Sequence, residues 1–221
     1  NVKASFDSDL YNWLNVGVNM AYSHYKNNGI ISGQGSNRAG VVLSVINTPT
    51  YAPIWNPNNP KQYFNDFYGA KNLTSPLENL ARTESNFDQT DRLLLTGEAT
   101  IKFTKDFKFK STVTMDRRWV HSFQFLDPVK TDYGRTQHGY ASDTRSDDRR
   151  MVYDNIFTYN ANWNAKHNFE AMGGTSATTS VWEQLWGERS YFNPDHIIIG
   201  LNGGNKTGAY GNSQSKSEWS I

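Results

Sequence analysis

Apolar and polar residues alternate along the stretch LLLTGEATIKFTKDFKFKSTVTMD, which covers residues 93–116. Every second position of Leu93–Phe103 is apolar or glycine. After a turn near 104–106, a similar alternation resumes over Phe107–Met115, and most side chains in between are polar. A period of two predicts a hairpin of antiparallel strands with one apolar and one polar face.

The same pattern recurs on both sides of this hairpin. It predicts hairpins over about 1–25, 89–124 and 148–183, and the start of another strand at about 217–221. No long window shows the 3.6-residue period of an amphipathic helix. The sequence therefore predicts an all-β fold in which the 221 residues form part of one domain.

The predicted connections alternate between short and long. Short turns are expected inside the hairpins, whereas long loops are expected over about 26–88, 125–147 and 184–216. Loops beyond about 12–15 residues are uncommon in compact domains, but outer-membrane barrels combine short periplasmic turns with long extracellular loops. The nine residues of Phe107–Met115 would span ~30 Å, or ~23 Å when tilted by ~40°, close to the apolar height of such barrels. We expect an antiparallel, up-and-down transmembrane β-barrel segment of six to seven strands, with the Leu93–Phe103 face toward lipid.

Aromatic residues mark the predicted strand ends, as in the two aromatic girdles of membrane barrels. Aromatic residues also favour strands in general, so this signal is weak alone. Near the far ends lie Tyr22, Tyr153 and Trp182. The residues predicted to lie at the membrane interface are Trp13, Phe103, Phe107, Trp119, Trp163 and Phe169.

The amino-acid composition argues against several classes of protein. Only 37% of the residues are hydrophobic, and no run approaches the ~18–20 apolar residues of a transmembrane helix. The net charge of +1 gives no reason to expect a nucleic-acid partner, and there is no cysteine. The histidines lack metal-ligand spacing and no catalytic set stands out, so we expect no metal, no cofactor and no enzymatic activity. Both ends of the sequence read as cut, which predicts a fragment.

Two aromatic-rich stretches in the expected extracellular loops are candidate contacts for a ligand or a lid protein. Flat aromatic rings can stack on sugars or on peptide side chains. The alternative, which the residues favour, is that each ring supports the small core of its own loop. The candidates are Tyr51, Trp55, Tyr63, Trp182, Trp186 and Tyr191.

Three stretches resemble the SusC/RagA group of TonB-dependent outer-membrane transporters from Bacteroidetes. They are NVKASFDSDLYNWLNVGVNMAYSHYKNNG, SPLENLARTESNFDQTDRLLLTGEATIKFTKDFKFKSTVTMD and NIFTYNANWNAKHNFEAMGGTS. The resemblance implies a bacterial outer-membrane barrel of about 22 strands with a plugged lumen. It further implies a SusD-like surface lipoprotein as partner, energy from TonB–ExbB–ExbD, contact with outer-membrane lipid, and import of glycan fragments, oligosaccharides or peptides.

Two alternatives share parts of this pattern. A passive porin would have the same strands and loops without a plug. A soluble, carbohydrate-binding β-sandwich would bury the face of Leu93, Ile101 and Val113 against a second sheet. The loop aromatics favour sugar over peptide as the ligand.

Overall fold

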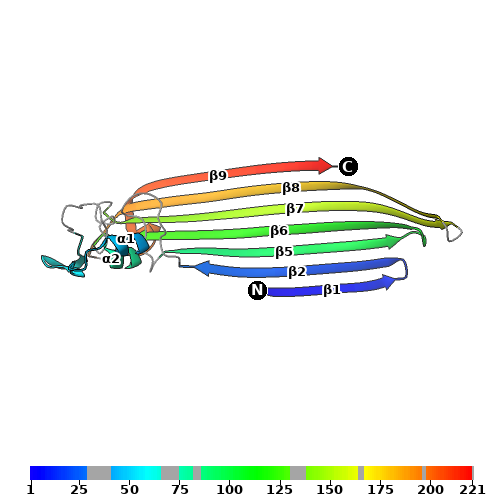
Figure 1. Cartoon of the computed structure of the whole chain (residues 1–221). Coiled ribbons are helices and arrows are strands. Elements are labelled where there is room, and N and C mark those ends of the chain that lie inside the picture. The colour runs from blue at the N-terminus through cyan, green and yellow to red at the C-terminus, as the bar shows by residue number, and fades with distance from the viewer. Residues whose placement is uncertain are drawn as a thin grey trace.

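One broad antiparallel sheet dominates the structure (Figure 1). The computed structural model describes residues 1–28, 41–65, 75–81, 86–129, 138–163, 167–195 and 198–220. Seven strands pair in the order β1-β2-β5-β6-β7-β8-β9, so each long strand pairs with the next long strand along the chain. Their bounds are β1 Val2–Tyr11, β2 Leu14–Asn27, β5 Phe87–Lys102, β6 Phe107–Leu126, β7 Tyr140–Trp163, β8 His167–Phe192 and β9 Gly204–Ser220.

The smaller elements lie between β2 and β5 and before β9. They are α1 (Val41–Asn47), β3 (Trp55–Asn56), β4 (Asn59–Tyr63), α2 (Pro76–Ala81) and a 3-10 turn, η1 (Leu201–Gly203). Figure 1 shows α1 and α2 at the end of the sheet opposite to the short turns. Neither these helices nor any other helix in the described ranges is long and apolar enough to cross a membrane.

The predicted all-β, antiparallel architecture is confirmed, including the short turn between β5 and β6. The turn between β1 and β2 lies at Asn12-Trp13. Asp7, Ser8 and Asp9 are paired residues of β1, although aspartate and serine are common in turns.

The bounds predicted for two long connections are corrected. β7 already begins at Tyr140 and β8 continues to Phe192, so strand replaces much of the loops expected over 125–147 and 184–216. The ladder between the two strands runs without a register shift from Tyr140–Ser190 to Trp163–His167. These extensions carry polar residues on both faces, so they lack the apolar alternation that identifies a strand.

The register places every side chain of the sheet on one of two faces. Residues directly opposite one another share a face, so Leu95 lies with Met20 and Met115, and Met115 lies with Met151. The intervening row through Glu98, which includes Thr112 and Asp154, points to the other side. We call these the apolar face and the polar face.

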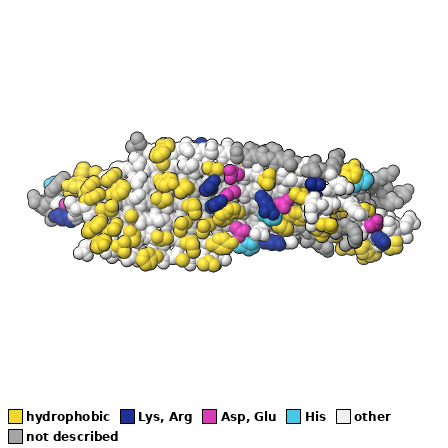
Figure 2. Space-filling view, turned by 180° about the vertical axis from the view of Figure 1, so that it is seen from behind, with side chains coloured by type: hydrophobic (Ala, Val, Ile, Leu, Met, Phe, Trp, Pro, Cys, Tyr) yellow, Lys and Arg dark blue, Asp and Glu magenta, His cyan; other side chains and the backbone are white. Residues whose placement is uncertain are grey.

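The apolar face is exposed along the half of the sheet that carries the short turns. Val18, Val113, Tyr153 and Phe157 each retain more than a third of their accessible surface. Figure 2 shows apolar side chains gathered over this end and charged side chains beyond them. We call the apolar part the belt; on β5 and β6 it extends over Leu93–Ile101 and Phe107–Met115.

Buried apolar packing is concentrated at the far end of the sheet. Phe125, Ala141 and Phe192 form a small core against which Phe123 and Leu201 pack. Among the described residues the only other sheet is the two-stranded β3–β4 pair, and the belt side chains remain exposed. The second sheet that a β-sandwich requires is therefore absent from the described part of the chain.

Candidate functional site

Stacked aromatic rings border the belt at the short turns. The Phe107 ring lies 5.4 Å from that of Phe103 and 6.0 Å from that of Phe157, and Tyr159 approaches Phe169 at 6.2 Å. Rings of this kind are typical of the level at which hydrocarbon meets lipid headgroups.

The other predicted interface aromatics fall at different levels. Trp13 stacks on Tyr11 in the β1–β2 turn, at the same end as Phe103. Trp119 shares the apolar face but lies beyond the opposite edge of the belt, opposite Asp91. The side chain of Trp163 lies outside the described residues. The assignment of these residues to a membrane interface remains a prediction.

A ladder of charged side chains crosses the polar face of β5, β6 and β7. Arg92 makes two hydrogen bonds to Asp116, at 2.8 and 2.6 Å, and Arg118 donates to Asp148 at 2.8 Å. Within the described residues the Arg150 side chain has no ion pair or hydrogen bond, although it lies near Asp116. We call these five residues the arginine–aspartate ladder.

The ladder borders a cavity of about 280 Å³, which Ser180 of β8 completes. Three guanidinium groups against two carboxylates leave one positive charge in excess. The ion pairs are partly exposed, so each contributes little to stability, at most about 1 kcal/mol. The guanidinium groups of the ladder can donate several hydrogen bonds, in a fixed geometry, to an anionic or hydroxylated ligand.

The predicted contact residues Trp182 and Trp186 lie in strand β8 and not in a loop. Both lie on the polar face, because Trp182 is paired with Asp148 and Trp186 with Thr144. Trp182 therefore lies beside the arginine–aspartate ladder, where a flat apolar surface adjoins charged donors. This combination is common where proteins bind sugars or peptides.

The other four predicted contact residues lie elsewhere. Trp55 and Tyr63 stack at 4.7 Å and close the β3–β4 hairpin, whereas Tyr51 is 71% exposed. Tyr191, near the end of β8, stacks on His138 at 4.8 Å. The six residues do not form one cluster in the structure, and the Trp55–Tyr63 stack supports its own hairpin.

A buried carboxylate organises the segment between β2 and β5. Glu78 of α2 is fully buried and accepts a hydrogen bond from Asn65 Nδ2. Asn65 Oδ1 in turn accepts one from the Ser75 amide at 2.7 Å. These bonds tie α2 to the chain that follows β4, so the connection has a folded structure of its own.

The ladder was not predicted from the sequence. Two dipeptides, Arg117-Arg118 and Arg149-Arg150, were the available signal, because adjacent residues of a strand point to opposite faces. Each dipeptide places one arginine on the polar face and one on the apolar face.

Comparison with known proteins gives structural matches only. No family model and no curated protein matches the sequence. The structure of the RagAB peptide transporter matches with a TM-score of 0.74 and 17% identity, over 98% of this chain and 25% of that chain. Structures of the RagAB peptide importer in its "closed-closed" and "open-open" states match with TM-scores of 0.67 and 0.66, each at 16% identity and 24% of that chain, over 96% and 98% of this chain.

These matches show the fold: the chain has the architecture of part of an antiparallel β-barrel. The chain spans about a quarter of the length of the solved chains that it matches. The predicted resemblance to the SusC/RagA group is confirmed at the level of the fold.

Proposed function

We propose that this chain forms part of the barrel wall of a SusC/RagA-type, TonB-dependent transporter in the bacterial outer membrane. One observation carries the proposal. The shared fold covers 98% of the chain, and the sheet with that fold exposes a continuous apolar belt on one face only. An apolar face of this size in water would be unfavourable, whereas in a membrane lipid covers it.

The two faces give the orientation of this wall. The belt faces lipid, and the polar face, with the arginine–aspartate ladder and Trp182, faces the lumen. The short turns lie on the periplasmic side, because outer-membrane barrels place their longer connections outside the cell. The segment with α1 and α2 is then extracellular.

The proposed activity is import of peptides or oligosaccharides. It is supported by the solved chains of similar fold, which are named a peptide transporter and a peptide importer, and by the sequence resemblance. The proposal includes a SusD-like lipoprotein as the extracellular partner and TonB–ExbB–ExbD as the energy source. It assigns no catalytic step and no cofactor.

Uptake by cells that produce the complete protein tests this function. Labelled peptides and labelled oligosaccharides are supplied separately, to cells with and without TonB and with and without the neighbouring lipoprotein. We expect uptake of one substrate class that requires both partners. A soluble protein, recovered without detergent, would contradict the membrane assignment.

A passive porin is the second candidate, since it has the same local features. It predicts entry of small solutes at equal rates with and without TonB. The length of the native polypeptide provides an independent test. The transporter requires a chain about four times as long as these 221 residues, and a native chain of 221 residues would leave a small barrel.

A further inference from the structure

Charged residues replace the belt on the apolar face where the sheet continues away from the short turns. The first row beyond Met115 and Met151 contains Arg117 and Arg149, which lie directly opposite one another on β6 and β7. The next row contains Asp91, Trp119, Asp147 and Glu183. These two rows, with Arg145 two residues before Asp147 on β7, are called the collar.

The two arginines at the belt edge differ in their partners. Arg117 donates two hydrogen bonds to Asp147, at 3.0 and 2.5 Å, and its guanidinium lies 4.7 Å from the Trp119 ring. Arg149 makes no ion pair or side-chain hydrogen bond with any described residue, although, after the hydrogen bonds from Arg117, its charge helps to lower the pKa of Asp147. Like charges directly opposite in a sheet are unfavourable, and Asp147, which is held by Arg117, offsets part of the repulsion between Arg117 and Arg149. A bound anion between the two arginines would offset more of it.

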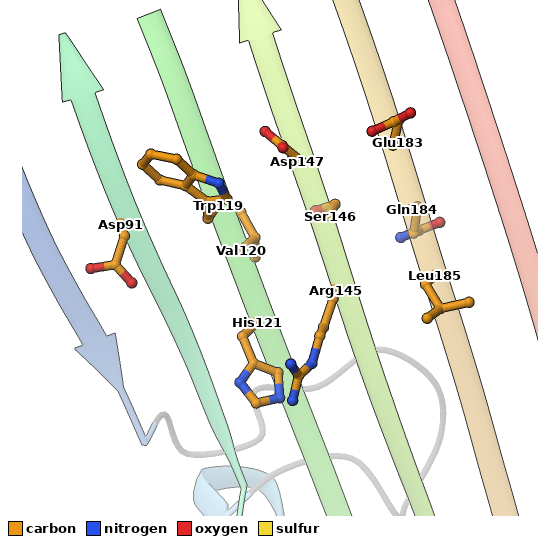
Figure 3. A pocket seen from close by; sticks show the side chains of 10 residues that line it. All are labelled: Asp91, Trp119, Val120, His121, Arg145, Ser146, Asp147, Glu183, Gln184 and Leu185. Carbon is orange, nitrogen blue, oxygen red and sulfur yellow. The ribbon is translucent and has the colours of Figure 1, made fainter.

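Trp119 and Asp147, the two residues that contact Arg117, line a cavity of about 410 Å³, which is within the size range of small-molecule sites. Figure 3 shows that its side chains come from four neighbouring strands, with Asp91, Trp119, Asp147 and Glu183 in one row. Arg145 and His121 lie next to each other in the row beyond.

The Asp91 carboxylate of this cavity is ionised at neutral pH. Hydrogen bonds from Gln89, Tyr22 and His24 lower the pKa of Asp91, which lies outside the belt, to about 2. A cavity that joins carboxylates, an indole ring and arginine suits a hydroxyl-rich ligand that also carries an anionic group. Carboxylates accept hydrogen bonds from sugar hydroxyls, and arginine binds phosphate through paired N–H groups.

We propose that the collar binds the phosphorylated sugar headgroup of an outer-leaflet glycolipid, with its phosphate between Arg117 and Arg149. This inference rests on the proposed function, which places the collar at headgroup level outside the cell. The acyl chains lie over the belt, directly below the arginine row. The sugar occupies the cavity and is hydrogen-bonded by Asp91, Asp147 and Glu183.

A simple anion fits this site less well than a phosphorylated sugar. The carboxylates that line the cavity repel a free phosphate inside it, whereas the hydroxyls of a sugar can donate further hydrogen bonds to them. Continuity with the belt also favours an amphiphile over a soluble sugar phosphate, because the cavity opens next to exposed apolar side chains.

The test uses the full-length protein purified from the outer membrane, stripped of lipid and placed in nanodiscs. Native glycolipid and the same glycolipid after chemical removal of its phosphates are titrated separately, with inorganic phosphate as a competitor. We expect the phosphorylated form to bind roughly ten-fold more tightly, and Arg149→Ala to remove that preference. Lys108→Ala removes one positive charge from the polar face of β6, outside both the collar and the ladder, and should leave lipid binding unchanged.

Equal affinity for the two glycolipids would overturn the phosphate assignment, as would an unchanged affinity of Arg149→Ala. Displacement of the glycolipid by millimolar inorganic phosphate would show that the site takes a free anion instead. Failure of the proposed function is detected separately: protein absent from the outer membrane overturns both proposals. Protein that is present there and transports, but does not distinguish the lipids, overturns this one alone.

Discussion

A charge at the centre of the belt should destabilise the protein in a bilayer, and the same charge one residue away should not. Val113 and Thr112 are neighbours on β6, with Val113 on the apolar face and Thr112 on the polar face. The variants Val113→Arg and Thr112→Arg therefore form a matched pair. They add the same side chain to the same strand and differ only in the face that receives it.

The depth of Val113 sets the magnitude. It lies six residues from Phe107 at one edge of the belt and four from Arg117 at the other, or ~20 and ~13 Å along the strand. With a tilt of ~40°, these distances become ~15 and ~10 Å along the membrane normal. Val113 is thus near the midplane, where arginine on the lipid face costs about 2–4 kcal/mol.

The free energy of unfolding is measured for the complete protein by denaturant titration in lipid bilayers. We expect a loss of about 2–4 kcal/mol for Val113→Arg and a change within about 0.5 kcal/mol for Thr112→Arg. Leu93→Arg, at the belt edge, should cost no more than about 1 kcal/mol. Equal losses for the Val113 and Thr112 variants would refute the assignment of the two faces. A stable Val113→Arg variant would refute the lipid contact.

Three further predictions concern the polar face and the close approach of two strands. Asp116→Ala removes the partner of Arg92, and a double-mutant cycle with Arg92→Ala should give a coupling of about 0.5–1 kcal/mol in the free energy of unfolding; no coupling would mean that the ion pair adds nothing. Trp182→Ala should lower the uptake rate without changing the amount of protein in the outer membrane, and unchanged uptake would remove Trp182 from the candidate site. Gly174→Ala would bring a Cβ to 2.5 Å from the Asn155 carbonyl oxygen, so it should lower the free energy of unfolding by about 1–3 kcal/mol, and a neutral effect would contradict that approach.

The strands that carry the belt could be predicted from the sequence because, within the belt, one face of each strand is mainly apolar and the other is mainly polar. Along β5 and β6 one face is apolar and the other is polar, as expected if the first meets lipid and the second meets water, so the residue pattern follows the period of the strand. β7 before Met151 and β8 after Val181 carry polar side chains on both faces. Alternation disappears in such segments although the backbone ladder continues. The start of β7 was therefore predicted eight residues too late, and the end of β8 nine residues too early.

The candidate site was less predictable than the fold for a related reason. Trp182 was among the predicted contact residues, but its place beside Asp148 follows only from strand register. Register depends on how two strands pair, and the residue pattern of one strand alone does not determine that pairing. The unpaired character of Arg149 likewise emerges only when its neighbours on β6 and β8 are known.

The length of β8 has a consequence for what reaches the protein. Its 26 residues span ~86 Å at ~3.3 Å each, of which the belt takes only about a third. The part of β8 beyond the belt is paired with β7 without a register shift, which makes it stiff. In the proposed orientation it therefore holds the connections at the far end of the sheet well above the lipid. In the proposed orientation, a bulky ligand would meet these connections well above the lipid surface, before it reaches the membrane.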